Sequence, residues 1–237
     1  LTDTMTQANP EKKRDGLLGN LLLNIIIPTL ILTKLSGDDY LGTKLSIVVA
    51  LAFPIIYGLN DFRTSGKLNF FSALGILSIF LTGGMSLLEL DPKYIAIKEA
   101  AIPALFGLAT LISLKTRYPL VKTFLYNDKI LQIDKVSAAL KNTGNEQAFS
   151  KALTNASYLI ALSFLLSSIL NYALAKYLLV SPPGTPEFNA ELGKMTALSF
   201  PVIALPATLI MMVALFYLFR SIKRLTQLTL EDILITE

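Results

Sequence analysis

The chain has 237 residues, of which 53% are hydrophobic and 16% charged, with a net charge of +4 and no Cys or His. The missing Cys excludes disulfides, thiolate metal sites and cysteine nucleophiles, and the missing His removes the commonest metal ligand and general base. No cofactor or metal site is therefore expected. An enzyme built from this chain would have to work with carboxylates, Lys, Tyr or Ser.

Six apolar stretches dominate the chain and predict an all-α, polytopic membrane protein. A hydrocarbon core of about 30 Å needs about 20 apolar residues in a helix, and the alternation typical of barrel strands is missing. The stretches cover residues 16–35, 45–59, 68–88, 94–114, 156–180 and 195–218. We expect transmembrane helices one to four within 16–114 and helices five and six within 152–220. Residues 1–15 and 221–237 are expected to be tails.

The basic residues are distributed unequally between the predicted loops. With the N-terminus inside, fifteen of the 21 Lys and Arg residues fall on the cytoplasmic side and six on the other. This bias predicts that both termini are cytoplasmic. It also explains the positive net charge through membrane orientation, so no nucleic-acid partner is expected. The first stretch lacks a small-x-small cleavage pattern and is interpreted as a retained helix rather than a signal peptide.

Residues 115–151 form the one long predicted loop, on the cytoplasmic side. Asn127 is a candidate cap for an amphipathic helix that runs to Lys141, with Gly144 just past its end. The apolar face of this helix consists of Ile130, Ile133, Val136 and Leu140. Such a helix suits the inner membrane surface, where it docks lipid or a partner. A solvated helix that merely links two spans is the alternative.

Prolines interrupt several predicted spans. Those inside the spans are Pro28, Pro54, Pro103, Pro201 and Pro206. Each removes a backbone donor and tends to kink its helix. Transporters build sites from such breaks, whereas in other membrane helices the freed carbonyls are satisfied by neighbouring groups. Both interpretations stay open. Outside the spans, residues 181–186 are expected to form a stiff turn.

Charges at membrane depth are the strongest functional pointers, because they are costly there. Asp61 ends the second span and is able to hold Arg63, Lys67 or an incoming cation, or else to form an interfacial ion pair.

Four more charges surround the hairpin between the third and fourth spans. Glu89 and Asp91 close the third span, while Lys98 and Glu99 lie about two turns into the fourth. They predict either a gate or binding site, or a salt-bridged clamp between adjacent helices.

Polar side chains also recur along individual helices. Ser163, Ser167 and Asn171 share one face of the fifth span, and small residues form a similar face on the third. Helix packing explains both faces, with a pore lining as the alternative. Asn24 and Asn171 are buried amides that demand partners. The pairs Asn24/Pro28 and Glu99/Pro103 have the same spacing, which hints at an inverted repeat.

Three short motifs within residues 21–176 resemble parts of the same known family. They are Gly83-Gly84-Met85-Ser86-Leu87-Leu88 followed by Asp91, Tyr94-Ile95 and Lys98; Lys115-Thr116-Arg117-Tyr118-Pro119-Leu120; and Asn155, Tyr158 and Leu170-Asn171. They resemble, in this order, the third-to-fourth helix hairpin, the following turn and the fifth helix of the intracellular septation protein A family. A longer loop, an extended C-terminal end and the lack of His and Trp make the chain more similar to an uncharacterised sister family of six-helix bacterial inner-membrane proteins. The resemblance implies an inner-membrane location and a role in envelope upkeep, and it carries over no catalytic residue.

The expected function is a non-enzymatic scaffold or accessory factor in maintenance of the bacterial envelope. A small transporter or channel for an ion or solute is the alternative, and a lipid-acting membrane enzyme ranks third. The expected partners are membrane lipids, envelope or division proteins and a second copy of the chain. The candidate polar site comprises Asn24, Asp61, Arg63, Glu89, Asp91, Lys98, Glu99, Asn155 and Asn171.

Overall fold

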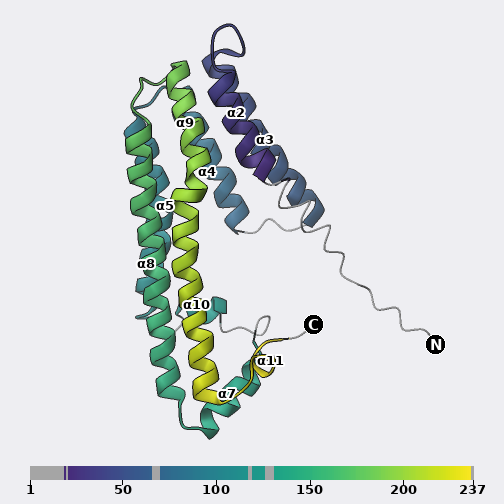
Figure 1. Ribbon diagram of the computed structural model, residues 1–237, viewed down its shortest axis with the longest axis vertical. Coiled ribbons are helices and arrows are strands. Elements are labelled where there is room, and N and C mark those ends of the chain that lie inside the picture. The colour runs from purple at the N-terminus through teal and green to yellow at the C-terminus, as the bar shows by residue number, and fades with distance from the viewer. Residues whose placement is uncertain (1–18, 20, 66–69, 117–118, 126–130, 236–237) are drawn as a thin grey trace, which may run out of the picture. The chain divides into compact units, whose positions relative to one another are not determined.

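A computed structural model describes residues 19, 21–65, 70–116, 119–125 and 131–235. Every regular element in these ranges is a helix (Figure 1). The elements are η1 (Leu22–Ile26), α2 (Ile27–Lys34), α3 (Gly42–Ser65), α4 (Phe70–Leu87), α5 (Pro92–Ser113), α6 (Leu120–Leu125), α7 (Ile133–Asn142), α8 (Glu146–Leu178), α9 (Pro186–Ser199), η2 (Phe200–Ala204), α10 (Leu205–Thr226) and α11 (Leu230–Ile233). Within the described residues, the one β pairing is an isolated bridge between Leu131 and Leu234. The prediction of an all-α chain is confirmed.

Four helical stretches are long and apolar enough to cross a membrane. They are Gly42–Asn60, Pro92–Ser113, Glu146–Leu178 and Pro186–Thr226. They match the second, fourth, fifth and sixth predicted stretches. At the first and third, the described residues form the shorter apolar helices Leu22–Lys34 and Ile76–Leu87. Four of the six predicted spans are thus confirmed as helices long and apolar enough to cross a membrane, and the count of six stays a prediction.

The last stretch begins earlier than its hydropathy predicts. It starts at Pro186, the last residue of the predicted turn, rather than near Met195. Thr185 caps this end, because its Oγ1 accepts a hydrogen bond from the N–H of Phe188 at 3.2 Å, and proline suits the first helical position. The turn itself contains Gly184 at φ +82°, a conformation that favours glycine.

Two π-helical segments each precede a proline. Pro28 and Pro206 stand in the first turn of α2 and α10, directly after η1 and η2. A proline ring crowds the carbonyl four residues earlier, and a wider π turn relieves that crowding. Pro103 instead lies inside the continuous helix α5. The predicted repeat of Asn24/Pro28 and Glu99/Pro103 is therefore not accompanied by the same backbone geometry.

The chain divides into two compact units. The first comprises Leu1–Ala96 and Leu174–Ser199, and the second Ile97–Ala173 and Phe200–Glu237. In the first unit, α2 packs against α3 and α9. Gly193 of α9 makes the close approach possible, since a Cβ there would lie 3.1 Å from the side chains of Leu32 and Thr33.

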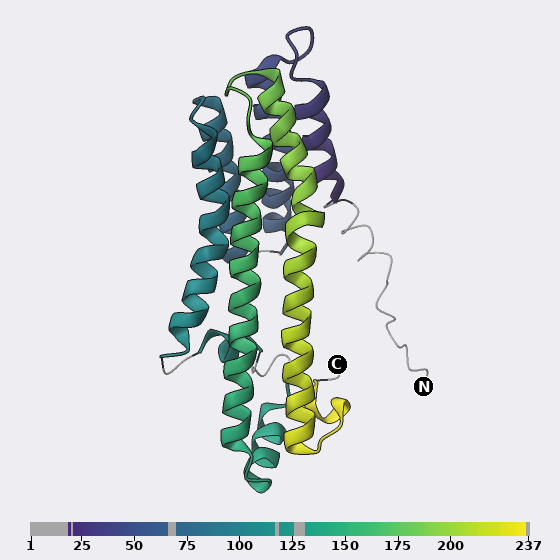
Figure 2. The ribbon, with the colours of Figure 1, turned by 60° about the vertical axis from the view of Figure 1, so that its left-hand side comes forward.

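In the second unit, α8 runs antiparallel to both α5 and α10. Ser168 Oγ donates to the carbonyl of Ala100 at 2.8 Å on the α5 side, and Ser163 Oγ donates to that of Ala207 at 2.7 Å on the α10 side. Figures 1 and 2 both show α8 and α10 side by side. For Ser163, the prediction of hydroxyls that bond across a helix interface is confirmed.

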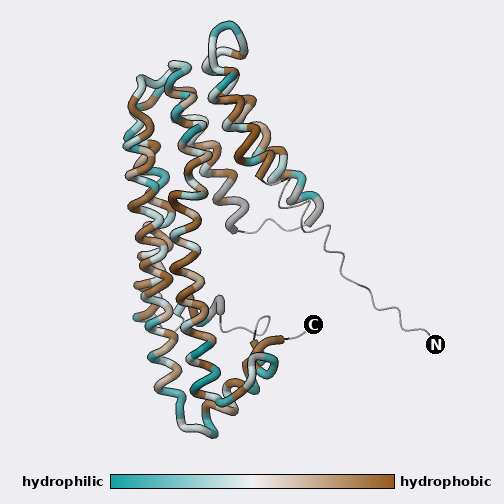
Figure 3. The backbone as a smooth tube through the Cα atoms, viewed as in Figure 1, coloured by the Kyte–Doolittle hydropathy of each residue, from teal (hydrophilic) through white to brown (hydrophobic). Residues whose placement is uncertain are grey.

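The exposed surface of α5, α8 and α10 changes from apolar to charged at a similar height along the three helices. In the described residues, the last strongly exposed apolar side chains are Ile112 on α5, Tyr158 on α8 and Phe216 on α10. The exposed charges that follow are Lys115, Lys151 and Arg220. Figure 3 shows the same change along α10, whose C-terminal end is hydrophilic. Charged groups avoid hydrocarbon, so this level is the expected edge of the membrane.

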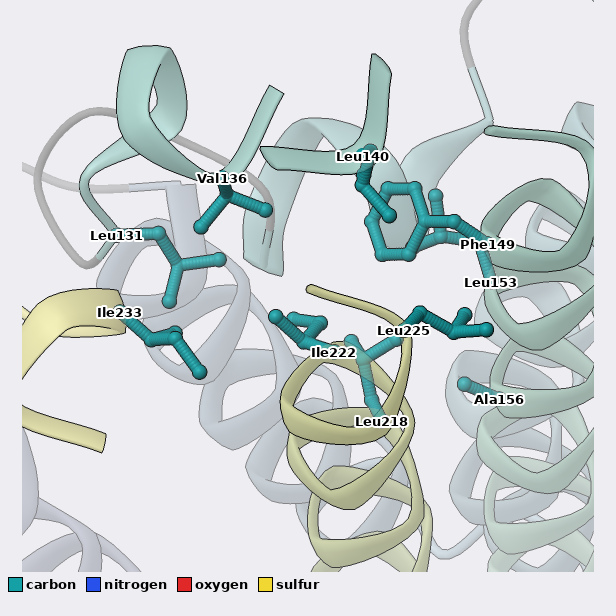
Figure 4. Close-up of a cluster of buried hydrophobic side chains, with 10 residues drawn as sticks. All are labelled: Leu131, Val136, Leu140, Phe149, Leu153, Ala156, Leu218, Ile222, Leu225 and Ile233. Carbon is teal, nitrogen blue, oxygen red and sulfur yellow. The ribbon is translucent and has the colours of Figure 1, made fainter. Parts of the chain in front are cut away.

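Beyond that edge, the chain folds into a subdomain that we call the helical cap, residues 131–157 and 218–234. Ten apolar side chains form its core (Figure 4). They are Leu131, Val136, Leu140, Phe149, Leu153, Ala156, Leu218, Ile222, Leu225 and Ile233. Full burial of each large member stabilises the cap by about 1.5–3 kcal/mol.

The cap corrects the expectation for the long loop. The predicted amphipathic helix is present as α7, and Gly144 follows its end at φ +65°. It begins at Ile133, and both Asn127 and Ile130 lie outside the described residues. Its apolar face is buried, with Val136 0% and Leu140 3% exposed. Because that face packs on α8 and α10, it is not the surface that meets lipid.

Candidate functional site

The charges at the end of α4 form exposed ion pairs. Glu89 Oε1 lies 3.3 Å from Lys44 Nζ of α3, with both side chains about half exposed or more. Asp91 Oδ2 lies 3.1 Å from Lys93 Nζ, and Asp91 Oδ1 accepts the backbone N–H of Lys93 at 2.9 Å. That backbone hydrogen bond, followed by the bond from the Lys93 side chain, lowers the pKa of Asp91. Asp91 thus caps the start of α5. The pair of Glu89 with Lys44 links the end of α4 to α3, whereas the pair of Asp91 with Lys93 is local to the start of α5.

Lys98 and Glu99 form a different kind of pair, inside a candidate span. Lys98 Nζ lies 2.6 Å from Glu99 Oε1, and the two side chains are 7% and 25% exposed. An ammonium at this depth is tolerated when a carboxylate neutralises it. The pair joins two neighbouring residues of α5, so it neutralises the charge without linking two helices.

The packing of α8 places further polar groups near this pair. A Cβ at Gly107 would lie 3.4 Å from the carbonyl of Ala161, and Ser168 bonds to Ala100. This antiparallel register puts Lys98 level with the turn of α8 that carries Asn171. Asn171 Nδ2 itself donates to the carbonyl of Ser167 at 2.8 Å. The second unit therefore assembles a polar layer from Lys98, Glu99, Ser168 and Asn171, and three of these four are among the predicted site residues.

The remaining predicted residues do not join that layer. Asn24 lies in the π-helical η1. Arg63 is exposed on α3 and lines an apolar cavity of about 740 Å³ with Tyr57 and Asn60. The side chain of Asp61 lies outside the described residues.

Asn155 connects two helices of the second unit. Its Nδ2 donates to the hydroxyl of Tyr217 at 3.1 Å, from α8 to α10. This bond sits beside Ala156 in the core of the cap, so Asn155 has a structural role.

A buried amide that the sequence did not single out organises the first unit. Asn189 of α9 is 0% exposed, and its Nδ2 donates to the carbonyl of Thr43 at 2.8 Å and to Ser46 Oγ at 3.0 Å. Ser46 Oγ also accepts from Ser36 Oγ at 2.9 Å. The network fixes the turn between α2 and α3 on α9. The sequence signal for Asn189 is its spacing with Phe188, Leu192 and Gly193, which places all four residues on one helical face. The structure buries that face.

The helical cap carries a polar cavity. About 460 Å³ in volume, it is lined by the end of α5, α6, α7 and the first turns of α8. Lys122 and Glu146 are its charged lining residues, and Ser137, Ser150 and Thr154 supply hydroxyls. Its volume falls in the range of small-molecule sites. Sequence reasoning missed it, although Glu146, Ser150 and Thr154 recur every four residues of α8.

The site offers binding groups rather than an evident reaction centre. Among the described residues, no group of three or more acidic side chains is placed to hold a metal ion. Its chemistry consists of an ion pair within a candidate span, a polar network, and a polar cavity at the expected membrane edge. Compared with known proteins, the chain matches no family model, no curated protein and no solved structure.

Proposed function

We propose that this chain is a non-enzymatic multi-pass scaffold of the bacterial inner membrane, and that the helical cap is its docking module. The proposal keeps both termini in the cytoplasm and takes envelope or division proteins as the partners. It rests on one observation above all, the buried apolar core that the cap builds beyond the end of the apolar belt.

A separate core matters because it makes a surface rigid. The cap is also held by polar bonds between distant segments. Gln132 Nε2 donates to the carbonyl of Leu234 at 2.9 Å, and Thr143 and Asn145 both donate to that of Leu225. Recognition of a partner costs less entropy when the docking surface is already ordered.

The charges around the cap favour the cytoplasmic side. The exposed basic residues on it and beside it include Lys115, Lys141, Lys151, Arg220, Lys223 and Arg224. This is the pattern expected of an inward-facing end. The resemblance to the septation family supports envelope proteins as the partners.

Photocrosslinking from the cap tests the proposal. A photoreactive residue at exposed position Ala138 of α7 should give a specific adduct with an envelope protein, whereas one at Ile169, which is 65% exposed on the apolar belt, should give lipid adducts only. Val136→Asp should abolish the protein adduct, because it places a charge in the core of the cap. The matched exchange Ala138→Asp, on the exposed face, should leave the cap folded. A cap that yields no protein adduct from any exposed position of α7 would refute the docking role.

Transport is the second candidate, and the buried Lys98–Glu99 pair favours it. A carrier that uses this pair should lose solute flux in proteoliposomes when Glu99 becomes Gln, while the exposed exchange Glu187→Gln leaves flux unchanged. Equal flux in both variants would exclude the pair from transport.

A further inference from the structure

The polar cavity of the helical cap holds two opposite charges that do not pair with each other. Lys122 and Glu146 both line it, and neither forms an ion pair within the described part of the chain. The hydroxyls of Ser137 and Ser150 likewise make no hydrogen bond there. A ligand with one anionic and one cationic group would satisfy both charged side chains at once.

Two other hydroxyls that line the cavity are able to accept hydrogen bonds from a ligand. Thr154 Oγ1 donates to the carbonyl of Ser150 at 3.0 Å, and Ser157 Oγ donates to that of Leu153 at 2.8 Å. Their protons are used within α8, so the oxygens are left as acceptors. Ammonium donors find acceptors along this helix, whose first residue carries the Glu146 carboxylate. The anionic end of a ligand finds Lys122.

The cavity also lies at the edge of the apolar belt. Its lining includes Leu114, directly after the end of α5, and Ser157 of α8. Two residues before Leu114 is Ile112, 55% exposed, and directly after Ser157 is Tyr158, 56% exposed. An apolar chain that leaves the cavity therefore continues onto lipid-facing surface.

From charge and position together, we infer that the cavity binds the headgroup of a zwitterionic aminophospholipid. The phosphate lies against Lys122 and the primary amine against Glu146, with hydroxyls of α7 and α8 completing the contacts. The acyl chains follow the exposed apolar faces of α5 and α8. This binding is independent of the docking role, since a lipid occupies the cavity whether or not the cap engages a protein.

Lipid selectivity provides the first test. Lys122 and Glu146 are both exposed. The full chain in phosphatidylcholine nanodiscs should therefore retain added phosphatidylethanolamine over phosphatidylglycerol by about fivefold, the scale of an exposed charge pair. Glu146→Gln should remove that preference, and Lys122→Gln should weaken the binding of both lipids. Lys141→Gln and Glu187→Gln are the matched controls, since both side chains are exposed and neither lines the cavity. Equal retention of the two lipids by the unchanged chain would overturn the inference.

A second measurement makes use of the absence of cysteine from the chain. Ser150→Cys places a single thiol in the lining of the cavity, and phosphatidylethanolamine should slow its reaction with maleimide about fivefold while phosphatidylglycerol does not. A thiol at exposed Asn142 is the control and should react equally with either lipid. Soluble glycerophosphoethanolamine should protect poorly. If it protected as well as the lipid, the assignment to a membrane lipid would fail, and unchanged labelling with every ligand would overturn the site.

Discussion

Replacement of Asn189 by Ala isolates the polar network that joins α2, α3 and α9. The change removes the bonds from Nδ2 to Thr43 O at 2.8 Å and to Ser46 Oγ at 3.0 Å. Each buried hydrogen bond contributes about 0.5–1.5 kcal/mol net, so the loss should be about 1–3 kcal/mol. The remaining groups keep partners, because Ser46 Oγ still donates to Thr43 O. The loss of stability should therefore be smaller than it would be if the carbonyl of Thr43 were left without any donor.

The replacement Asn189→Asp sharpens the test. It keeps the shape of the side chain but turns a donor into an acceptor that faces the carbonyl of Thr43. A buried charge without a partner costs about 3–5 kcal/mol, so this variant should be less stable than the Ala variant. Lys194→Ala is the control, since Lys194 is exposed on the same helix and should change stability by less than about 0.5 kcal/mol.

Unfolding in detergent micelles with added SDS, followed by circular dichroism, gives the free-energy differences. Hydrogen exchange of residues 29–46 reports the same loss locally. If the Asn189→Ala variant is as stable as the Lys194→Ala variant, and hydrogen exchange of residues 29–46 is unchanged, the amide of Asn189 does not hold the turn on α9.

Two further perturbations probe the second unit. Gly107→Leu should destabilise the protein by about 1–3 kcal/mol, since a Cβ at this position of the α5–α8 contact would already lie 3.3 Å from Phe164 Cβ. Gly84→Leu is the control, because Gly84 faces open space, and it should change the thermal midpoint little. Equal thermal midpoints for the two variants would contradict the close packing. Hydrogen bonds from Lys135 and then Thr229 lower the pKa of Asp232 to about 2. A lowered carboxyl pKa contributes stability that is fully present above the unfolded value of 3.8 and is lost as pH falls through about 2. Protection of residues 229–235 from hydrogen exchange should therefore hold from pH 7 to 4 and fall towards pH 2. Asp232→Asn should flatten this pH dependence. The same protection profile in the variant and the unchanged chain would contradict a stabilising bond between Asp232 and Lys135.

Local signals predicted much of the architecture. The long apolar stretches became helices, because a backbone in lipid must satisfy its own hydrogen bonds. The apolar spacing of Val136 and Leu140 identified α7, and the glycine after it marked its end. Lys98 and Glu99 stood out as costly charges in an apolar stretch, and the structure pairs them.

Other features could not be predicted from neighbours in the chain. Hydropathy placed the start of the last stretch at Met195, because the polar first turns of α9 are buried against protein rather than against lipid. Likewise, an amphipathic α7 suits a membrane surface as well as a protein core, and its spacing alone does not distinguish them.

By itself, the sequence determined the helices, the candidate spans and the residues too costly to leave unpaired, since each follows from local hydropathy and charge. The tertiary structure decided what covers each face and which partner each polar group finds. Asn189 bonds to residues 143 and more positions away, and the cavity at the membrane edge is assembled from α5, α6, α7 and α8. Such contacts depend on how whole helices pack, and no short window of sequence encodes that packing.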